Sequence, residues 1–213
     1  MLSPRQQFLL DTTLPRARFP LARAATPAAA FAAPIERLWL EVGFGSGEHA
    51  ESLARANPSV GLIACEVFAN GICSLLGRLV PEGGEADAPL PGNLLLWDDD
   101  ARILLRALPD GALDALFLMF PDPWPKARHA KRRFVHPLAL AAIARVLRPG
   151  AEWRIASDDP TYQQWVAEVL AAQTLFDAPP PVGERPAGWP ATRYEAKALR
   201  AGRHPLYWSL RRR

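Results

Sequence analysis

The segment Leu38-Trp39-Leu40-Glu41-Val42-Gly43-Phe44-Gly45-Ser46-Gly47-Glu48-His49 decides the fold of this chain. Its first half is a short apolar run, which predicts a buried strand over residues 38–42. Three alternating glycines follow, and residues 48–55 then predict a helix that stops before Asn57-Pro58. A strand, a glycine turn and a helix in this order begin a βαβ unit, and the glycines let the backbone approach a nucleotide-like ligand closely.

The same alternation continues along the chain. Further strands are predicted at 60–65, 93–97, 113–119, 151–156 and 206–210, and further helices at 68–80, 101–108, 136–147, 162–172 and 192–202. Strands that alternate with helices predict an α/β fold with a mostly parallel sheet. Ligands of such sheets bind outside the carboxyl ends of the strands. We therefore expect one site from the residues that follow the strands, namely Gly43–Gly47, Glu66, Asp98–Asp100, Asp122 and Asp158.

Composition narrows the class of protein. The 213 residues are 49% hydrophobic and 22% charged, which is typical of a soluble globular protein. No apolar run is long enough to span a membrane, and the N-terminus does not look like a secretory signal, so we expect a cytoplasmic protein. Cys65 and Cys73 are too few for a disulfide framework and have no companions that would make a metal site. Five prolines interrupt residues 1–34, which predicts a partly irregular N-terminal arm before one domain over residues 35–213.

The glycine turn favours a cationic ligand. Gly43, Gly45 and Gly47 form a Gly-x-Gly-x-Gly pattern, whereas the dinucleotide fingerprint is Gly-x-Gly-x-x-Gly. Glu41 lies just before the turn, where it would repel a pyrophosphate and attract a cation. The turn also lacks a phosphate-binding Lys. These features fit S-adenosylmethionine better than NAD or ATP.

Acids at the ends of the next two strands suit the rest of such a cofactor. Glu66 stands where an acid accepts hydrogen bonds from ribose hydroxyls. Among Asp98–Asp100, one carboxylate could accept a bond from an adenine amino group and another could cap the following helix. We favour Asp100 for the cofactor, because it directly precedes the helix.

Residues 120–133 join a rigid acid to a basic patch. In Phe-Pro-Asp-Pro-Trp-Pro-Lys, prolines on both sides of Asp122 restrict the backbone. Residues 126–133 then contain five Lys or Arg and no acid, as phosphate-binding surfaces do. The basic run could instead be a solvated face, and Trp124 could either stack on a base or pack the loop. The fixed carboxylate beside the patch favours chemistry on a nucleic acid.

Five segments together resemble the bacterial tRNA (guanine-N7-)-methyltransferase family: Glu41–His49 (EVGFGSGEH), Cys65-Glu66, Phe120–Val135 (FPDPWPKARHAKRRFV), Ser157-Asp158 and Thr192–Gly202 (TRYEAKALRAG). The resemblance covers residues 35–210 and implies a Rossmann-like class I methyltransferase fold, with a mostly parallel seven-stranded sheet and helices on both faces. It also implies methyl transfer from S-adenosylmethionine to N7 of guanosine 46 in the variable loop of tRNA. The role of residues 1–34 and the choice between monomer and homodimer stay open.

The resemblance assigns roles to individual residues. Those implied for the cofactor are Glu41, Gly43, Gly45, Gly47, Glu66, Asp100 and Asp122. Those implied for tRNA are Lys126, Asp158, Thr192, Arg193, Tyr194 and Glu195, and the basic residues Arg128, Lys131, Arg132 and Arg133 would hold its backbone. The acidic loop 82–92 would repel phosphate, so we expect it to lie away from the tRNA.

Asp122 is the expected catalytic residue. Guanine N7 carries a free lone pair, so the reaction needs no general base, and a carboxylate can stabilise the charge that develops on the imidazole ring. Two other assignments have plain structural alternatives. Asp158 could cap the helix that begins at Pro160, and Thr192 with Glu195 could form a capping box.

Two other functions compete with the methyltransferase reading. The glycine turn and Glu66 are also compatible with a nicotinamide-dependent oxidoreductase. The basic loop could belong to a non-catalytic RNA-binding protein built on a methyltransferase scaffold. We expect an enzyme that takes S-adenosylmethionine and tRNA and needs no metal.

Overall fold

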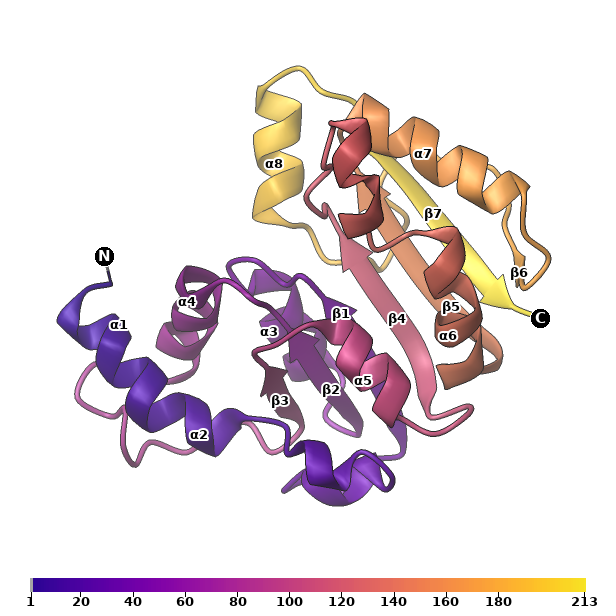
Figure 1. Cartoon of the computed structure of the whole chain (residues 1–213). Coiled ribbons are helices and arrows are strands. Elements are labelled where there is room, and N and C mark those ends of the chain that lie inside the picture. The colour runs from indigo at the N-terminus through magenta and orange to yellow at the C-terminus, as the bar shows by residue number, and fades with distance from the viewer. Residues whose placement is uncertain (1) are drawn as a thin grey trace. The chain divides into compact units, whose positions relative to one another are not determined.

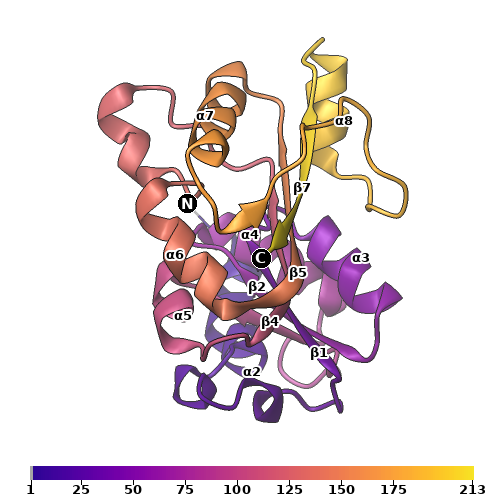
Figure 2. The ribbon, with the colours of Figure 1, turned by 90° about the vertical axis from the view of Figure 1, so that its right-hand side faces the viewer.

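The computed structural model describes residues 2–213, which form two compact units, residues 2–109 and residues 110–213 (Figure 1). Seven strands lie within these described residues, three in the first unit and four in the second. Helices pack on both faces of the strands in each unit (Figure 2). The α/β class expected from the alternating pattern is therefore correct.

The first unit is a parallel sheet in the order β3-β2-β1. Its strands are β1 (Arg37–Val42), β2 (Val60–Cys65) and β3 (Leu94–Trp97), and the helices that follow them are α3 (Glu48–Ala56), α4 (Ala69–Leu79) and α5 (Ala101–Ala107). All residues of β2 are buried because this strand lies between the other two. Helices α3 and α5 lie on opposite faces of the sheet (Figure 2).

The N-terminal arm is more regular than its prolines suggest. It forms α1 (Pro4–Phe8), a π-helical turn η1 (Leu9–Thr13) and α2 (Leu14–Ala17), followed by the 3-10 turns η2 (Leu21–Arg23) and η3 (Pro27–Ala30). The helical run extends from residue 4 to residue 17. Pro4 lies in the first turn of α1, where a missing N–H costs no hydrogen bond, whereas Pro15 lies inside the continuous run and closely follows the π-helical turn η1.

The arm covers the edge strand of the first unit. Phe19 is fully buried, and its amide donates to the Leu96 carbonyl of β3 at 2.7 Å. The carbonyl of Glu85 accepts from Thr13 Oγ1 at 2.7 Å and from Arg16 at 3.2 Å. The acidic loop therefore anchors the arm through a buried glutamate.

The second unit combines parallel and antiparallel pairing. Its strands are β4 (Leu113–Met119), β5 (Leu147–Ser157), β6 (Phe176–Asp177) and β7 (Leu206–Arg212), and its helices are η4 (Ala127–Arg132), α6 (Pro137–Val146), α7 (Pro160–Ala171) and α8 (Arg193–Arg200). β4 and β5 are parallel, whereas β7 is antiparallel to both β5 and β6. Helices α6 and α7 lie on one face of the strands and α8 lies on the other (Figure 2).

Two details differ from the expected elements. β5 begins at Leu147 rather than at residue 151, because Leu147 already pairs with Leu113 before a register shift. The two-residue strand β6 was not expected. Its Phe176 packs against Trp153 with ring centroids 5.4 Å apart, and both side chains are buried. Tertiary packing of Phe176 therefore stabilises β6, a strand that is too short to show a hydrophobic pattern in the sequence.

Candidate functional site

The glycine turn after β1 has a left-handed backbone. Gly43, Gly45 and Gly47 have φ values of +72°, +59° and +84°. A Cβ on Gly43 would meet no atom within 4 Å, so the turn leaves open space there. A Cβ on Gly71 of α4 would lie 2.5 Å from the Gly45 carbonyl oxygen. Gly71 thus lets α4 approach the turn, a role that the sequence pattern did not reveal.

Glu41 is a buried acid with a histidine partner. Its side chain is 1% exposed, and Oε1 lies 3.0 Å from Nδ1 of His49, which is 4% exposed. Its second oxygen, Oε2, has no hydrogen-bond partner among the described residues. A buried carboxylate oxygen without a donor is costly, so it fits a site that receives a donor or a cation.

Glu66, directly after β2, shapes the neighbouring backbone. Oε2 accepts from the Gly45 amide at 2.9 Å, and Oε1 accepts from the amides of Val67 at 2.8 Å and Phe68 at 3.1 Å. The side chains of Val67 and Phe68 are each 58% exposed. An acid that orders a glycine turn beside exposed apolar side chains suits a nucleoside, which presents hydroxyls and a flat ring.

The three aspartates after β3 have different partners. Asp98 accepts two hydrogen bonds from Arg18 of the arm, both at 2.7 Å. Asp99 accepts from the Asp100 amide at 2.6 Å. Asp100 caps α5 by accepting from the Arg102 amide at 2.9 Å, and its carboxylate remains half exposed.

Three acids of the first unit affect the pKa of the buried Cys65 thiol. Burial raises the pKa of Cys65 well above its ordinary value, and the negative charges of Glu41, Glu66 and Asp100 raise it further. The thiol therefore stays protonated and is not a nucleophile. The three acids that affect this pKa are all expected cofactor residues. Together with the open glycine turn and the unpartnered Glu41 oxygen, they fit a cationic nucleoside cofactor.

Asp122 lies in a strained loop of the second unit. Phe120 and Trp124, two residues away on either side, have positive φ values of +53° and +44°. Non-glycine residues in this region cost on the order of 1–3 kcal/mol each and persist where surrounding contacts hold them. The Phe120 amide donates to the Ala156 carbonyl of β5 at 2.8 Å. Asp122 itself is exposed.

The basic run after this loop forms the short helix η4. Lys126, Arg128, Lys131 and Arg132 are exposed. The Arg132 guanidinium lies over the Trp124 ring at 4.6 Å from its centroid, and His129 meets the same ring edge-on. The contacts of Trp124 therefore pack the loop. Arg133 differs from its neighbours because it is only 5% exposed.

Asp158 follows β5 and does not cap α7. Its Oδ2 accepts from Arg203 Nε at 2.5 Å, whereas the neighbouring Asp159 caps the helix by accepting from the Tyr162 amide at 2.9 Å. The capping alternative for Asp158 is therefore wrong. Arg203 therefore competes with any ligand for Oδ2 of this carboxylate.

The segment Thr192–Glu195 begins α8. Thr192 Oγ1 accepts from the Glu195 amide at 3.0 Å, so Thr192 is the N-cap, but the Glu195 carboxylate bonds elsewhere and does not complete the expected capping box. The Glu195 carboxylate accepts from Tyr207 at 2.9 Å and from Arg185 at 3.1 Å. Burial raises the pKa of Tyr207, and the hydrogen bond to Glu195 raises it further, so the phenol remains a donor. Arg193 and Tyr194 are exposed on the first turn of the helix.

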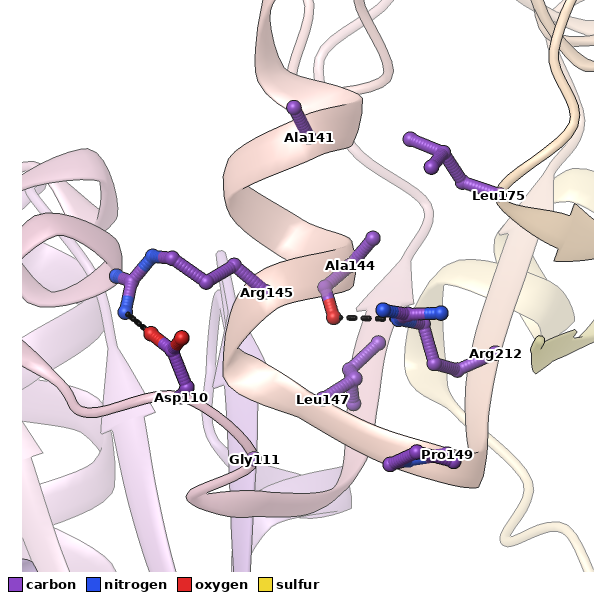
Figure 3. Close-up of a pocket in the computed structure, with 9 residues that line it drawn as sticks. All are labelled: Asp110, Gly111, Ala141, Ala144, Arg145, Leu147, Pro149, Leu175 and Arg212. Carbon is purple, nitrogen blue, oxygen red and sulfur yellow. Dashed lines mark hydrogen bonds and ion pairs between the residues drawn. The ribbon is translucent and has the colours of Figure 1, made fainter.

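A cavity of about 450 Å³ lies elsewhere in the second unit (Figure 3). Its rim carries an Asp110–Arg145 ion pair at 2.7 Å, and Arg212 Nε donates to the Ala144 carbonyl at 2.6 Å. Asp110 precedes β4, so the cavity lies at the amino end of that strand, whereas Asp122 follows its carboxyl end. None of the expected site residues lines this cavity.

The chain is similar to known proteins over most or all of its length. A family model described as "Putative methyltransferase" matches residues 36–207. The tRNA (guanine-N(7)-)-methyltransferase of Granulibacter bethesdensis is 65% identical over 213 residues, which cover 100% of this chain and 91% of that protein. The protein of the same name from Rhodospirillum rubrum is 46% identical over 221 residues, covering 100% of this chain and 84% of the relative.

Solved structures support the fold. The 16S rRNA methyltransferase KamB has a TM-score of 0.55 and 21% identity, over 83% of this chain and 89% of that chain. An rRNA methylase from Streptococcus thermophilus has a TM-score of 0.55 and 15% identity, over 100% of this chain and 98% of that chain. At these identities the likeness concerns the fold alone, which is Rossmann-like. With the family model and the relatives, it follows that this chain is a methyltransferase and belongs to the bacterial tRNA (guanine-N7-)-methyltransferase family.

Proposed function

We propose that this chain transfers a methyl group from S-adenosylmethionine to N7 of guanosine 46 in the variable loop of tRNA. The relatives that cover the whole of this chain are named for guanine N7 of tRNA, which supports this target. The observation that carries the choice of cofactor is the buried Glu41 carboxylate, whose Oε2 has no partner among residues 2–213. A cationic donor would compensate this oxygen, whereas a pyrophosphate would be repelled by it.

The residues of the first unit hold the donor in this proposal. Glu41 and the glycine turn receive its charged portion, Glu66 bonds the ribose hydroxyls and Asp100 the adenine amino group. Val67 and Phe68 offer the exposed apolar surface on which the purine ring packs. When bound, S-adenosylmethionine supplies an electrophilic methyl group on a sulfonium.

The residues of the second unit hold the acceptor. Guanine N7 attacks with its lone pair as the carbon–sulfur bond breaks, so no proton is removed and the positive charge passes to the imidazole ring of the base. The protein must align the reacting atoms, which is a proximity effect, and must stabilise the new charge. Asp122 is the carboxylate for that second task, because its proline-bounded loop holds it in a defined position.

Exposed cations and the start of α8 position the tRNA. Lys126, Arg128 and Arg132 contact backbone phosphates, which fix orientation without reading sequence. Asp158 and the segment Thr192–Glu195 direct the guanosine. A tRNA substrate also implies that the enzyme works in the cytoplasm.

The test is a direct assay with unmodified tRNA and methyl-labelled S-adenosylmethionine. We expect label in the tRNA and strand cleavage by aniline at position 46, because N7-methylguanosine makes the chain labile there. A tRNA with adenosine at position 46 is the matched control and should take up no label. Binding of tRNA without transfer would instead favour an RNA-binding protein, and calorimetry that shows NAD binding without S-adenosylmethionine binding would favour an oxidoreductase.

A further inference from the structure

Arg133 ends the basic run but points inward. Its side chain is 5% exposed, whereas Lys126, Arg128, Lys131 and Arg132 are exposed. Its amide donates to the Ala130 carbonyl at 3.0 Å, which ends η4 and turns the chain. A residue with this burial is not a surface contact for phosphate.

The Arg133 guanidinium binds the backbone of the Asp122 loop. Nε donates to the Pro123 carbonyl at 3.2 Å, and Nη2 donates to the Trp124 carbonyl at 3.0 Å. The two acceptors are consecutive residues and directly follow Asp122. One planar side chain therefore fixes the exit of the loop at two adjacent points.

The same guanidinium also lies over an aromatic ring. Its Cζ lies 4.7 Å from the centroid of the Trp165 ring on α7, a cation–π contact. Trp165 is itself fixed, since its Nε1 donates to the Val135 carbonyl at 2.6 Å. Arg133 thus connects the loop to a helix of the second unit.

The loop needs such a connection because its backbone is strained. The left-handed conformation of Trp124 is unfavourable for a bulky residue, and its carbonyl is one of the two acceptors of Arg133. Without the two hydrogen bonds, the backbone after Asp122 would relax toward ordinary φ values. The Asp122 carboxylate would then lose its defined position.

We propose that Arg133 is a positioning residue that holds Asp122 in place through the loop backbone, and that it does not contact tRNA phosphate. Its kinetic consequence rests on the proposed methyl transfer, whereas its structural consequence does not. The five basic residues then have two different roles. Lys126, Arg128, Lys131 and Arg132 are exposed, whereas the buried Arg133 holds the loop that carries Asp122.

Lysine would not replace this arginine. A guanidinium presents several N–H groups in one plane, so it can donate to two neighbouring carbonyls while its face lies on an aromatic ring. An ammonium is a compact charge on a flexible stem and cannot keep that geometry. Arg133→Lys keeps the positive charge but removes the planar guanidinium. It therefore tests whether the shape of the side chain or only its charge is needed.

The test compares Arg133→Gln and Arg133→Lys with the matched variant Arg128→Gln, which removes the same charge from an exposed position of η4. We expect both Arg133 variants to lower kcat on the order of tenfold to a hundredfold, as small displacements of reacting groups do. The tRNA dissociation constant and its salt dependence should stay close to those of the unaltered enzyme. Arg128→Gln should instead weaken tRNA binding and reduce the slope of log K against log salt by about 0.7–0.9.

A second measurement is independent of activity. We expect the 19F resonances of 5-fluorotryptophan at positions 124 and 165, assigned with Trp→Phe variants, to shift in both Arg133 variants and to remain in place in Arg128→Gln. Unshifted resonances in Arg133→Gln would overturn the proposal even if no methyl transfer is found. The proposal would also be overturned if Arg133→Gln kept full kcat and reduced the slope of log K against log salt as much as Arg128→Gln does. If Arg133→Gln does not fold, an Arg133→Lys enzyme with normal kcat and an unshifted spectrum would also refute it.

Discussion

The Arg18 guanidinium donates two parallel hydrogen bonds to the Asp98 carboxylate, from Nε to Oδ1 and from Nη2 to Oδ2, both at 2.7 Å. This pair joins the N-terminal arm to the end of β3, where the aspartates expected at the cofactor begin. The hydrogen bond and the charge of Asp98 raise the pKa of Arg18 against the smaller opposing effect of burial. Because Arg18 occupies both oxygens of Asp98, this acid has a structural partner, whereas Asp100 keeps a half-exposed carboxylate.

The two aspartates should therefore respond differently to the same substitution. We expect Asp100→Asn to weaken binding of S-adenosylhomocysteine on the order of tenfold, which is the loss of one hydrogen bond to a charged group. Asn also caps helices well, so the start of α5 should survive. Asp98→Asn is the control and should change the affinity less than about threefold while lowering stability by up to about 1 kcal/mol. Calorimetry and urea unfolding measure both effects, and a larger affinity loss in Asp98→Asn would assign the adenine contact to Asp98.

Asp122→Asn tests the electrostatic role of the exposed acid. The substitution preserves size and removes the charge, so we expect kcat to fall on the order of a hundredfold, as it does when one transition-state stabiliser is lost. The affinity for tRNA should change little, because a single carboxylate contributes no phosphate contact. Rapid-quench measurement of single turnovers reports the chemical step directly. A normal single-turnover rate would show that the charge of Asp122 does not stabilise the methylated base.

Substitution of Arg128 and Lys131 tests whether the tRNA binds across η4. Both are exposed on η4, and replacing both with Gln should reduce the slope of log K against log salt by about 1.4–1.8, corresponding to two phosphate contacts. Filter binding of tRNA over a range of salt concentrations measures this slope. The double variant Arg37→Gln with Arg106→Gln removes equal charge from the first unit and is the control. Equal slopes in the η4 variant and the unaltered protein would mean that the tRNA binds elsewhere.

Glu85 predicts an acid-sensitive attachment of the arm. The hydrogen bond from Arg5 Nε, at 2.8 Å, lowers the pKa of Glu85 below its ordinary value of 4.5, and backbone hydrogen bonds lower it further. A lowered folded-state pKa adds stability above the ordinary value, and this stability is lost as the pH falls through the folded-state value. We expect the difference in urea midpoint between the unaltered chain and Glu85→Gln to be largest at neutral pH and to vanish in acid. A difference that is constant with pH would show that ionisation of Glu85 does not hold the arm.

Local patterns predicted most of the secondary structure. The glycine turn, the helix that follows it and the buried runs of β1, β2 and β4 all form near the expected residues, because each is determined by hydrophobic period and by residues that stop helices. The arm and β6 were harder to predict. Residues 9–17 are helical because they pack on the first unit, and Phe176 is in a strand because its ring packs on Trp153. Such long-range contacts leave no periodic signal in a short segment.

The sequence by itself determined which chemical groups the protein has and roughly where each follows a strand: acids and glycines in the first half, a rigid acid and a basic run in the second. Those properties depend on residue type and spacing, which local chemistry dictates. Only the tertiary structure decided which of these residues bonds to another part of the protein and which is exposed. Asp98 pairs with the arm while Asp100 caps a helix, and Arg133 turns inward while Arg128 stays in solvent. Neighbouring residues of the same type differ here because burial and hydrogen-bond partners come from distant segments, which spacing along the chain does not encode.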